Sequence, residues 1–161
     1  MSFELTSKDI HDGQRLPQTH VFNAMGHQGA NLSPHLARHG EPAGTKSFVI
    51  TMFDPDAPTG SGWWHWTIAN IPAQVHELAQ GAGTANTALP LGATHGRTDF
   101  GSACYGGAAP PAGPPHRYIF TVYAIDTDRL DLDEQSSGAL VGFLVHFHSL
   151  GKATLTTSYG I

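Results

Sequence analysis

The sequence predicts one domain built mainly from β-strands, and three features of the chain support this prediction. Glycine and proline are abundant, with 19 and 11 residues, whereas charged residues make up only 13% of the chain, a composition typical of many turns. Three runs rich in β-branched and aromatic residues, 47–53, 63–71 and 116–125, are each bounded by turn-forming residues. No internal repeat or linker divides the 161 residues, so residues 1–161 are one predicted domain.

Short elements are expected in the first part of the chain. Ser2–Thr6 and His20–Ala24 match short strands, and a segment rich in turn formers separates them. A loop rich in glycine, asparagine and proline then continues to Gly44. The run Ser47–Phe53 indicates a central strand, which stops at Asp54 because the sequence DPDAPTGSG is a dense cluster of turn formers.

The next predicted strand, Trp63–Ile71, contains all three tryptophans of the chain and is halted by Pro72. Because successive side chains on a strand point to opposite faces, alternate residues share a face. One face would then carry core residues, and the other would carry a mixed set suited to the wall of a pocket. The core set is Trp64, Trp66 and Ile68, and the pocket set is Trp63, His65 and Thr67.

The middle of the chain combines a long loop with the clearest strand. Residues 74–81 are expected to be irregular or extended, and Gly81–Ala103 is expected to be a loop. A loop of this length within a compact domain indicates a functional or self-packed segment. The run His116–Ile125 alternates strongly and is predicted to be a strand with His116 and Tyr118 on one face.

The segment 136–151 fits two structures. Its apolar residues match helical spacing, with Leu140, Phe143, Leu144 and Phe147, but Val141, Phe143, Val145 and Phe147 also alternate as in a strand. Its length and its terminal signals favour a helix, with Ser136 or Ser137 as the cap at its start and Gly151 at its end. Residues 152–160 then form the last predicted strand.

Charge and hydropathy exclude several classes of function. A formal net charge of −5 leaves no basic stripe for phosphates along a nucleic acid, so nucleic-acid binding is not expected. No apolar run approaches the ~20 residues that a transmembrane helix requires, and the N-terminus lacks the apolar region of a signal peptide. The single Cys104 fits a reducing compartment, so we expect a cytoplasmic protein.

Polar residues gather where the three strongest predicted strands end or begin. If these strands are neighbours, one rim of the sheet carries the side chains of Asp54, Asp56, His65, His116 and Tyr118. Imidazoles donate hydrogen bonds to anions, and the amides of Gly106 and Gly107 could approach an anion closely because glycine lacks a Cβ. The rim therefore predicts a small site for a phosphate or carboxylate, with affinity that falls as pH rises through the histidine range near ~6.5.

Two other functions stay open at this point. A hydrolase could use one histidine as a base oriented by Asp54, with water as the nucleophile. A metalloprotein could use two histidines and one carboxylate, a ligand set known for non-haem iron. The chain has no HExxH, CxxC, GxSxG, GxxxxGK[ST] or GxGxxG motif, so we assign no catalytic residue, metal ligand or cofactor.

Taken together, the segments DPDAP, WWHWTIANIP, DFG…YGG…PP…HRYIFTVYAI and NLSPHL resemble the phosphatidylethanolamine-binding protein family. The resemblance extends from about residue 31 to residue 159 and points to the bacterial YbhB/YbcL-type (Raf kinase inhibitor-like) branch. It implies a β fold in which a large central antiparallel sheet packs on a smaller sheet, with few short helices.

The resemblance also implies a site and partners. It implies a ligand-binding pocket formed by Asp54, Asp56, Trp63, His65, Gly107, Pro110, His116 and Tyr118. Its ligand would be a small anionic or phosphorylated molecule, such as phosphate or a phosphoethanolamine-type head group, bound without catalysis. Further implied partners are a kinase or protease target that the protein regulates or inhibits, and a second copy of the chain in a homodimer.

Overall fold

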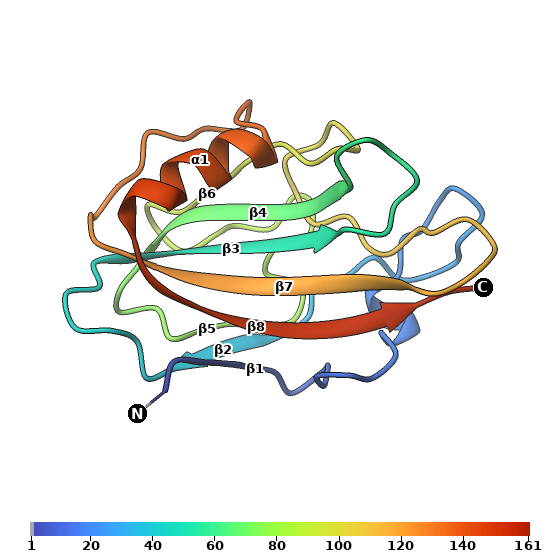
Figure 1. The fold of residues 1–161 in the computed structure, drawn as a ribbon, viewed down its shortest axis with the longest axis horizontal. Coiled ribbons are helices and arrows are strands. Elements are labelled where there is room, and N and C mark those ends of the chain that lie inside the picture. The colour runs from blue at the N-terminus through green and yellow to red at the C-terminus, as the bar shows by residue number, and fades with distance from the viewer. Residues whose placement is uncertain (1) are drawn as a thin grey trace.

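Residues 2–161, which the computed structural model describes, form two antiparallel β-sheets and one α-helix (Figure 1). The large sheet has the strand order β6-β4-β3-β7-β8, and the small sheet has the order β1-β2-β5. The predicted fold class, a large antiparallel sheet beside a smaller one, is therefore confirmed. The strands are β1 (Glu4–Thr6), β2 (Leu36–His39), β3 (Ser47–Asp54), β4 (Trp63–Pro72), β5 (Glu77–Leu78), β6 (Thr94–His95), β7 (His116–Ile125) and β8 (Ser149–Tyr159), and the helix is α1 (Gly138–His148).

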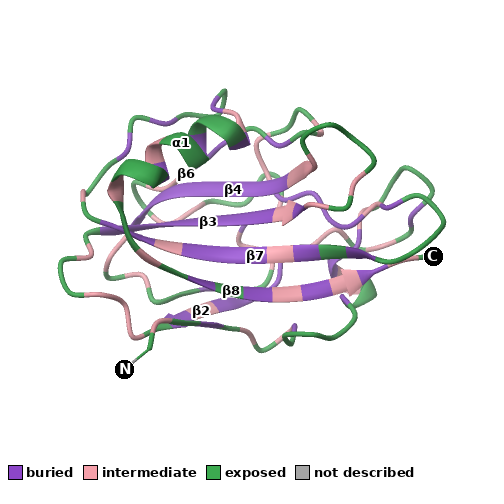
Figure 2. Cartoon of the chain, viewed as in Figure 1, coloured by how far each residue is buried: buried purple, intermediate pink, exposed green. Residues whose placement is uncertain are grey.

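The main hydrophobic core lies between the two sheets. The small sheet contributes Leu5, Leu36 and Leu78, which belong to the same cluster as inward-facing residues of the large sheet. Phe48 on β3 and Phe120 on β7 are 1% and 0% exposed, as expected for β-branched and aromatic runs with one face against a second layer. Figure 2 shows that the central strands of the large sheet are mostly buried.

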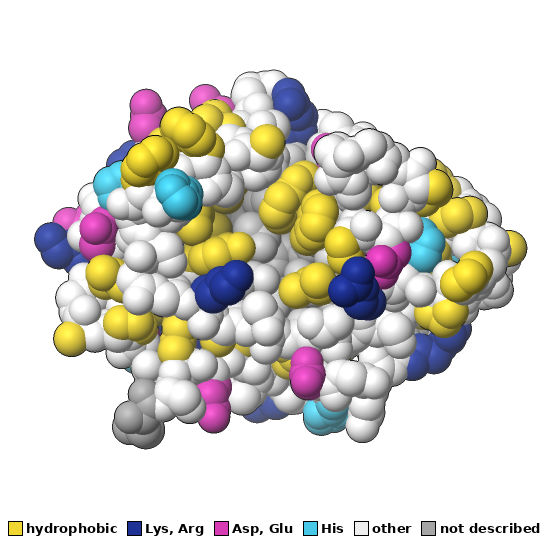
Figure 3. Space-filling model, in the orientation of Figure 1, with side chains coloured by type: hydrophobic (Ala, Val, Ile, Leu, Met, Phe, Trp, Pro, Cys, Tyr) yellow, Lys and Arg dark blue, Asp and Glu magenta, His cyan; other side chains and the backbone are white. Residues whose placement is uncertain are grey.

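The opposite face of the large sheet is partly covered by α1, which contacts β4 and β7. Val141 and Val145 of the helix pack in a second cluster with Val49 and Ile125 of the sheet. The outer side of α1 is also apolar, and Figure 3 shows hydrophobic side chains gathered over this helix. The exposed apolar residues of the helix are Leu140, Phe143 and Phe147. No helix formed by residues 2–161 combines the length and the apolar character that crossing a membrane requires.

The ambiguous segment is a helix, as the terminal signals predicted. Ser137 caps its start, because the Ser137 side chain accepts a hydrogen bond from the amide of Leu140. The predicted end at Gly151 is wrong, since α1 ends at His148 and β8 begins at the next residue. Gly151 instead pairs with Ala124 in the β7–β8 ladder, so strand pairing overrides the local stop signal.

Three other predictions are corrected by long-range pairing. Residues 20–24 are not a strand: a 3₁₀ helix spans Gln18–His20, and Val21 forms only an isolated bridge with Ala108. The predicted loop before Gly44 contains β2, which is short but lies between β1 and β5. The long loop of residues 81–103 contains the two-residue strand β6, which pairs with Ile68 and Ala69 at the edge of the large sheet.

The tryptophan strand carries a β-bulge that changes its predicted faces. Trp66 pairs with Met52, whereas Trp64 pairs with Phe53, so His65 is an extra residue without a partner in the β3–β4 ladder. Trp63, paired with Asp54, therefore shares the inner face with Trp66. The predicted core and pocket sets are wrong in this respect. Trp64 lies on the outer face against Phe53, and the Thr67 hydroxyl lies beside Gly96 near α1.

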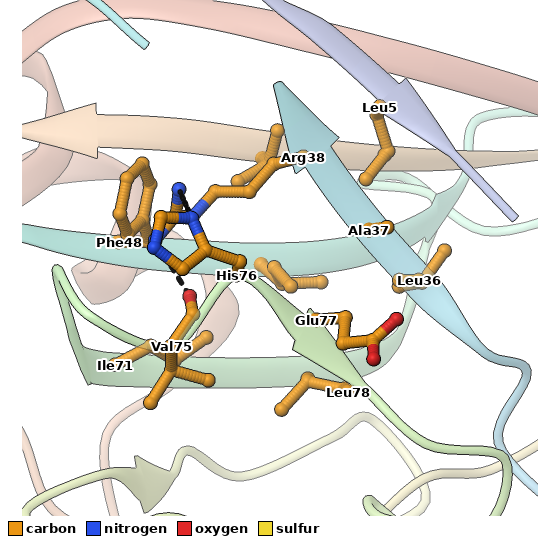
Figure 4. Close-up of a pocket in the computed structure, with 12 residues that line it drawn as sticks. Leu5, Leu36, Ala37, Arg38, Phe48, Ile71, Val75, His76, Glu77 and Leu78 are labelled. Atoms are coloured by element: carbon orange, nitrogen blue, oxygen red, sulfur yellow. Dashed lines mark hydrogen bonds between the residues drawn. The ribbon is translucent and has the colours of Figure 1, made fainter. Parts of the chain in front are cut away.

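A buried arginine occupies the space between the small sheet and the start of β3 (Figure 4). The Arg38 side chain donates to the carbonyls of Ala73 and Val75, both at 2.6 Å, and lies 3.2 Å from His76 Nδ1. The Arg38 guanidinium also lies 3.5 Å from the ring centre of Phe48 and 3.3 Å from a carboxylate oxygen of Glu41. We call Arg38 and these five neighbours the Arg38 cluster, and the hollow beside it measures only about 10 Å³.

Candidate functional site

The end of β3 and the beginnings of β4 and β7 meet at one rim of the large sheet, drawn on the right in Figure 1. A cavity of about 180 Å³ opens there, which we call the His116 cavity. Six of the eight predicted site residues line it: Asp54, Trp63, His65, Pro110, His116 and Tyr118. The other lining residues are Met25, Ala57, Pro58, Thr59, Phe100, Ala109 and Pro111. The structure thus brings together side chains from three strands and three loops.

Asp54 and His116 form a buried pair at the base of the cavity. His116 Nδ1 lies 2.7 Å from Asp54 Oδ2, and the two residues are 8% and 2% exposed. The other oxygen of Asp54 accepts a hydrogen bond of 2.8 Å from the amide of Asp56. Because a carboxylate only accepts, Nδ1 of His116 carries the proton in this pair. Asp54 therefore fixes the ring orientation of His116 and directs Nε2 away from the carboxylate.

His65, the extra residue of the bulge, lies beside this pair. Its Nδ1 is 2.8 Å from the carbonyl oxygen of Gly106, and its ring meets those of Tyr118 and Phe100 edge-on at 5.2 and 5.4 Å. Burial lowers the pKa of His65 to about 4, which outweighs the opposing hydrogen bond from the ring to Gly106 and the nearby Asp54 carboxylate. Near neutral pH the ring of His65 is therefore neutral.

Two polar groups in the lining have no protein partner. The indole nitrogen of Trp63 and the hydroxyl of Tyr118 are buried without a hydrogen bond to any part of the chain that the structure describes. Burial, followed by the charge of Asp54, raises the pKa of Tyr118, so its hydroxyl keeps its proton. An unpaired buried donor costs about 1–3 kcal/mol. Such groups in a cavity are the ones that a bound molecule can satisfy.

Phe100 completes the aromatic wall and was not predicted as a site residue. Its ring meets that of Trp63 at 5.3 Å and stacks on Phe22 at 4.4 Å. The preceding Asp99 holds it there, because Asp99 exchanges hydrogen bonds of 2.7 and 2.9 Å with the backbone of Trp64. The unusual length of the loop before residue 103 was the only signal in the residues themselves that could have pointed to Phe100.

Asp56 and Gly107 do not line the cavity. Asp56 forms a two-pronged ion pair with the Arg117 side chain at 2.9 and 3.0 Å, which lowers the pKa of Asp56 to about 2. The amide of Gly107 donates to Asn31 Oδ1 at 2.7 Å, and the amide of Gly106 donates to the carbonyl of His65 at 2.9 Å. The expected anion site made of free glycine amides is therefore not present. Gly107 instead allows close packing, because a Cβ there would overlap the backbone of residues 20–22.

The charges around the cavity are few. No lysine or arginine is among its described lining residues, and Asp54 is the one carboxylate there. Nor does any group of three His, Cys, Asp or Glu side chains within residues 2–161 gather closely enough to hold a metal ion. Near neutral pH, the cavity can supply the imidazoles of His65 and His116, the indole N–H of Trp63 and the phenol of Tyr118 to a small molecule.

Comparison with known proteins agrees with this architecture. Residues 6–160 match a family model described as phosphatidylethanolamine-binding protein. The chain belongs to this family. The segments that carry the resemblance contain Asp54, His65 and His116, which now lie around one cavity.

The most informative relatives are bacterial. The chain is 58% identical to the Escherichia coli UPF0098 protein YbhB over 156 residues, which cover 97% of this chain and 99% of YbhB. It is 50% identical to E. coli YbcL over 162 residues. A crystal structure of YbcL, described as a new member of the mammalian PEBP family, matches with a TM-score of 0.98 and covers 100% of this chain. A Chlamydia trachomatis homologue, CT736, matches at 28% identity with a TM-score of 0.83 over 99% of this chain.

Proposed function

We propose that this member of the family is a non-enzymatic binding protein for small anionic or phosphorylated ligands, which it holds in the His116 cavity. The observation that supports this most strongly is the pair of buried, unpartnered donors on Trp63 and Tyr118 beside two histidines. A tetrahedral oxyanion has several acceptor atoms on one centre and can satisfy such groups together.

The size of the cavity points to a head group rather than a whole lipid. Its volume of about 180 Å³ is smaller than the roughly 300–1,000 Å³ of sites that enclose drug-sized ligands. The description of the family names phosphatidylethanolamine, whose head group consists of a phosphate and a short amine. Phosphate and phosphoethanolamine are therefore the first ligands to test.

The wider proposal includes partners and location. Regulation or inhibition of a kinase or protease, self-association into a homodimer and a cytoplasmic location are part of it. Sedimentation of the purified protein tests dimerisation, and the exposed Phe143 and Phe147 on α1 are the first residues to mutate if a dimer forms.

A hydrolase is the second candidate, because the Asp54–His116 pair is an arrangement that can orient a general base. Two hydroxyl side chains are among the described lining residues. That of Thr59 donates to the carbonyl of Gly62, and the phenol of Tyr118 keeps its proton. The described lining therefore offers no free side-chain nucleophile, and a hydrolase there would use water as its nucleophile. Release of alcohol from phosphate and carboxylate esters, lost in His116→Ala, would instead establish the hydrolase.

The binding proposal is tested by following the histidine ring signals by NMR during titration with phosphate and with phosphoethanolamine. We expect the signals of His65 and His116 to shift, and we expect His116→Ala to weaken binding by about tenfold or more. His148 offers a matched control, because its Nδ1 lies 2.9 Å from Asp126 on the exposed end of α1. His148→Ala should leave the affinity unchanged. If neither His65 nor His116 responds in the folded protein, the proposed function is wrong.

A further inference from the structure

One residue that lines the His116 cavity has an unusual backbone conformation. Four non-glycine residues among residues 2–161 have a positive φ, and three of them are asparagines, which tolerate this conformation. The fourth is Met25, with a φ of 56°. The amide of His27 donates to the carbonyl of Ala24 at 3.1 Å, so Met25 and Gly26 are the central residues of a turn. Both have positive φ, a pattern that favours glycine, asparagine or aspartate, so methionine is strained at position 25.

The chain on both sides of this turn is fixed to the wall of the cavity. Before the turn, the ring of Phe22 stacks on that of Phe100 at 4.4 Å. After the turn, His27 is 6% exposed, and its Nε2 lies 2.9 Å from the carbonyl oxygen of Pro110. Phe100 and Pro110 both line the cavity. Met25 lines it as well but is 65% exposed, so its thioether lies at the mouth of the cavity, where solvent reaches it.

The thioether of Met25 has a chemical property that no other side chain lining the cavity shares. Peroxides oxidise a thioether to a sulfoxide, which changes an apolar, flexible side chain into a polar one, and reductases reverse the change. Within residues 2–161 the other methionine is Met52, which is 0% exposed in the core. Backbone strain is found at functional sites, and a side chain that is mostly exposed adds little to the core. The strained Met25 is therefore expected to act at the cavity mouth.

A sulfoxide at this position would act against an anionic ligand. Asp54 is buried at the base of the cavity, and neither lysine nor arginine is found among the described residues that line it. The oxygen of a sulfoxide carries a partial negative charge, so at the mouth it would repel an anion that no permanent cation of the lining attracts. It would also hold water where the thioether offers an apolar contact to the ligand. Oxidation of Met25 should therefore weaken binding.

We propose that Met25 is an oxidation site that regulates the His116 cavity: a peroxide converts its thioether to a sulfoxide, and the sulfoxide lowers the affinity for the ligand. In this step the sulfur of Met25 forms a bond to one oxygen of hydrogen peroxide, the O–O bond breaks, and the other oxygen leaves as water. The sulfur is oxidised by two electrons, and the peroxide is reduced. Methionine sulfoxide reductase restores the thioether, with two thiols giving a disulfide and water. This inference rests on the proposed function and adds a form of regulation to the same site.

The experiment measures the affinity of the full chain for phosphoethanolamine by calorimetric titration, before and after treatment with hydrogen peroxide. Peptide mapping by mass spectrometry measures the oxidation of each methionine separately. We expect Met25 to be oxidised under conditions that leave the buried Met52 intact. The affinity should then fall by about fivefold or more, because an apolar contact at the mouth is lost. Methionine sulfoxide reductase with a thiol should restore both the thioether and the affinity.

Three variants separate Met25 from the other groups that peroxide can oxidise. Met25→Leu has an apolar side chain without sulfur, so treated and untreated samples of this variant should bind equally well. Cys104→Ser is the matched control, because Cys104 is the one thiol of the chain and is not among the described lining residues. It should lose affinity on treatment as the wild type does. Met25→Gln places a polar side chain of similar length at the mouth and should lower the affinity without any oxidant.

The outcomes separate this inference from the proposed function. If the untreated protein binds phosphoethanolamine but peroxide leaves Met25 intact, or if oxidised Met25 leaves the affinity unchanged, the inference alone is overturned. The same holds if treated Met25→Leu loses as much affinity as the treated wild type, since another group is then responsible. If the untreated protein does not bind phosphoethanolamine, the proposed function is overturned as well. A reversible loss of affinity that requires Met25 supports both.

Discussion

The Arg38 cluster and the His116 cavity both place polar side chains inside the fold, near opposite ends of β3. In the Arg38 cluster, the guanidinium reaches two carbonyls, a histidine and a carboxylate, and it lies against the Phe48 ring. The adjoining hollow of about 10 Å³ has room for roughly one water molecule. Burial lowers the pKa of Arg38, but the Glu41 carboxylate opposes this shift.

The His116 cavity has the opposite character. Its hollow of about 180 Å³ lies beside two buried donors that no described residue satisfies, those of Trp63 and Tyr118. These two regions show how a polar side chain inside a fold can be assigned a role. Where every partner comes from the chain itself, the group stabilises the fold, and where partners are absent beside a cavity, the group is available to a ligand.

The largest expected effect comes from breaking the satisfied cluster. Arg38→Ala should lower the free energy of unfolding by about 3 kcal/mol, because the carbonyls of Ala73 and Val75 lose their donor and Phe48 loses a packing partner. Urea denaturation measures this loss. Affinity of the folded variant for phosphate should not change, and a fall in that affinity would show that the two regions are coupled.

The free energy of unfolding of the protein should fall in acid because of a buried histidine in the cavity. The unfolded chain titrates His65 near pH ~6.5, but burial lowers the pKa of folded His65 to about 4, so the unfolded state binds more protons between these values. Stability is therefore fully present above pH ~6.5 and is lost as pH falls toward ~4, by about 3 kcal/mol. Burial also lowers the pKa of His95 to about 4, so His65→Gln should remove part of the slope and His95→Gln another part. If the free energy of unfolding of His65→Gln falls with pH as steeply as that of the wild type, His65 is not a source of the acid sensitivity.

The β-bulge places two neighbouring tryptophans, Trp63 and Trp64, on opposite faces of the sheet, so that one variant can serve as the control for the other. Trp63→Phe removes the unpartnered indole N–H and should weaken phosphoethanolamine binding by about tenfold. Trp64→Phe is the control, because Trp64 lies one residue away on the outer face against Phe53. Calorimetric titration with phosphoethanolamine measures the affinity of both variants. If both lose the same affinity, the position of Trp63 on the inner face does not give it a special role in binding.

Two tyrosine variants compare a buried hydroxyl that has no hydrogen-bond partner with one that has a partner. Tyr118→Phe removes a buried hydroxyl without a partner and should raise the free energy of unfolding by about 1 kcal/mol. Tyr105→Phe should cost about 1–2 kcal/mol, because the Tyr105 hydroxyl donates to the carbonyl of His20 at 2.7 Å. Thermal unfolding of the two variants provides the test, and the reverse ranking would contradict the assignment of roles.

The fold was predictable where local preference and tertiary pairing agree. The runs at 47–54 and 116–125 are β-branched and aromatic, and each became a central strand. Disagreement arose where the deciding partner is distant in sequence. The residues that matched helical spacing in this segment, Leu140, Phe143 and Phe147, lie on the exposed side of α1, whereas Val141 and Val145 are buried, because α1 is apolar on both sides.

The sequence located the site, but it did not predict the role of every residue there. Strand ends located Asp54, His65 and His116, since neighbouring antiparallel strands bring their ends to one rim. The amide of Gly107 was misassigned because its acceptor, Asn31, lies 76 residues away in the chain. The side of β4 occupied by each tryptophan was also mispredicted, because a bulge is a property of two strands and leaves no mark on one of them alone.

The β-bulge in the β3–β4 ladder limits how this site could be transferred to another protein. Transplanting the same amino acids onto a regular antiparallel hairpin would send either His65 or Trp66 to the wrong side, since an even alternation cannot aim both inward. A recipient scaffold would therefore need a β-bulge at the same position as well as the side chains of the site.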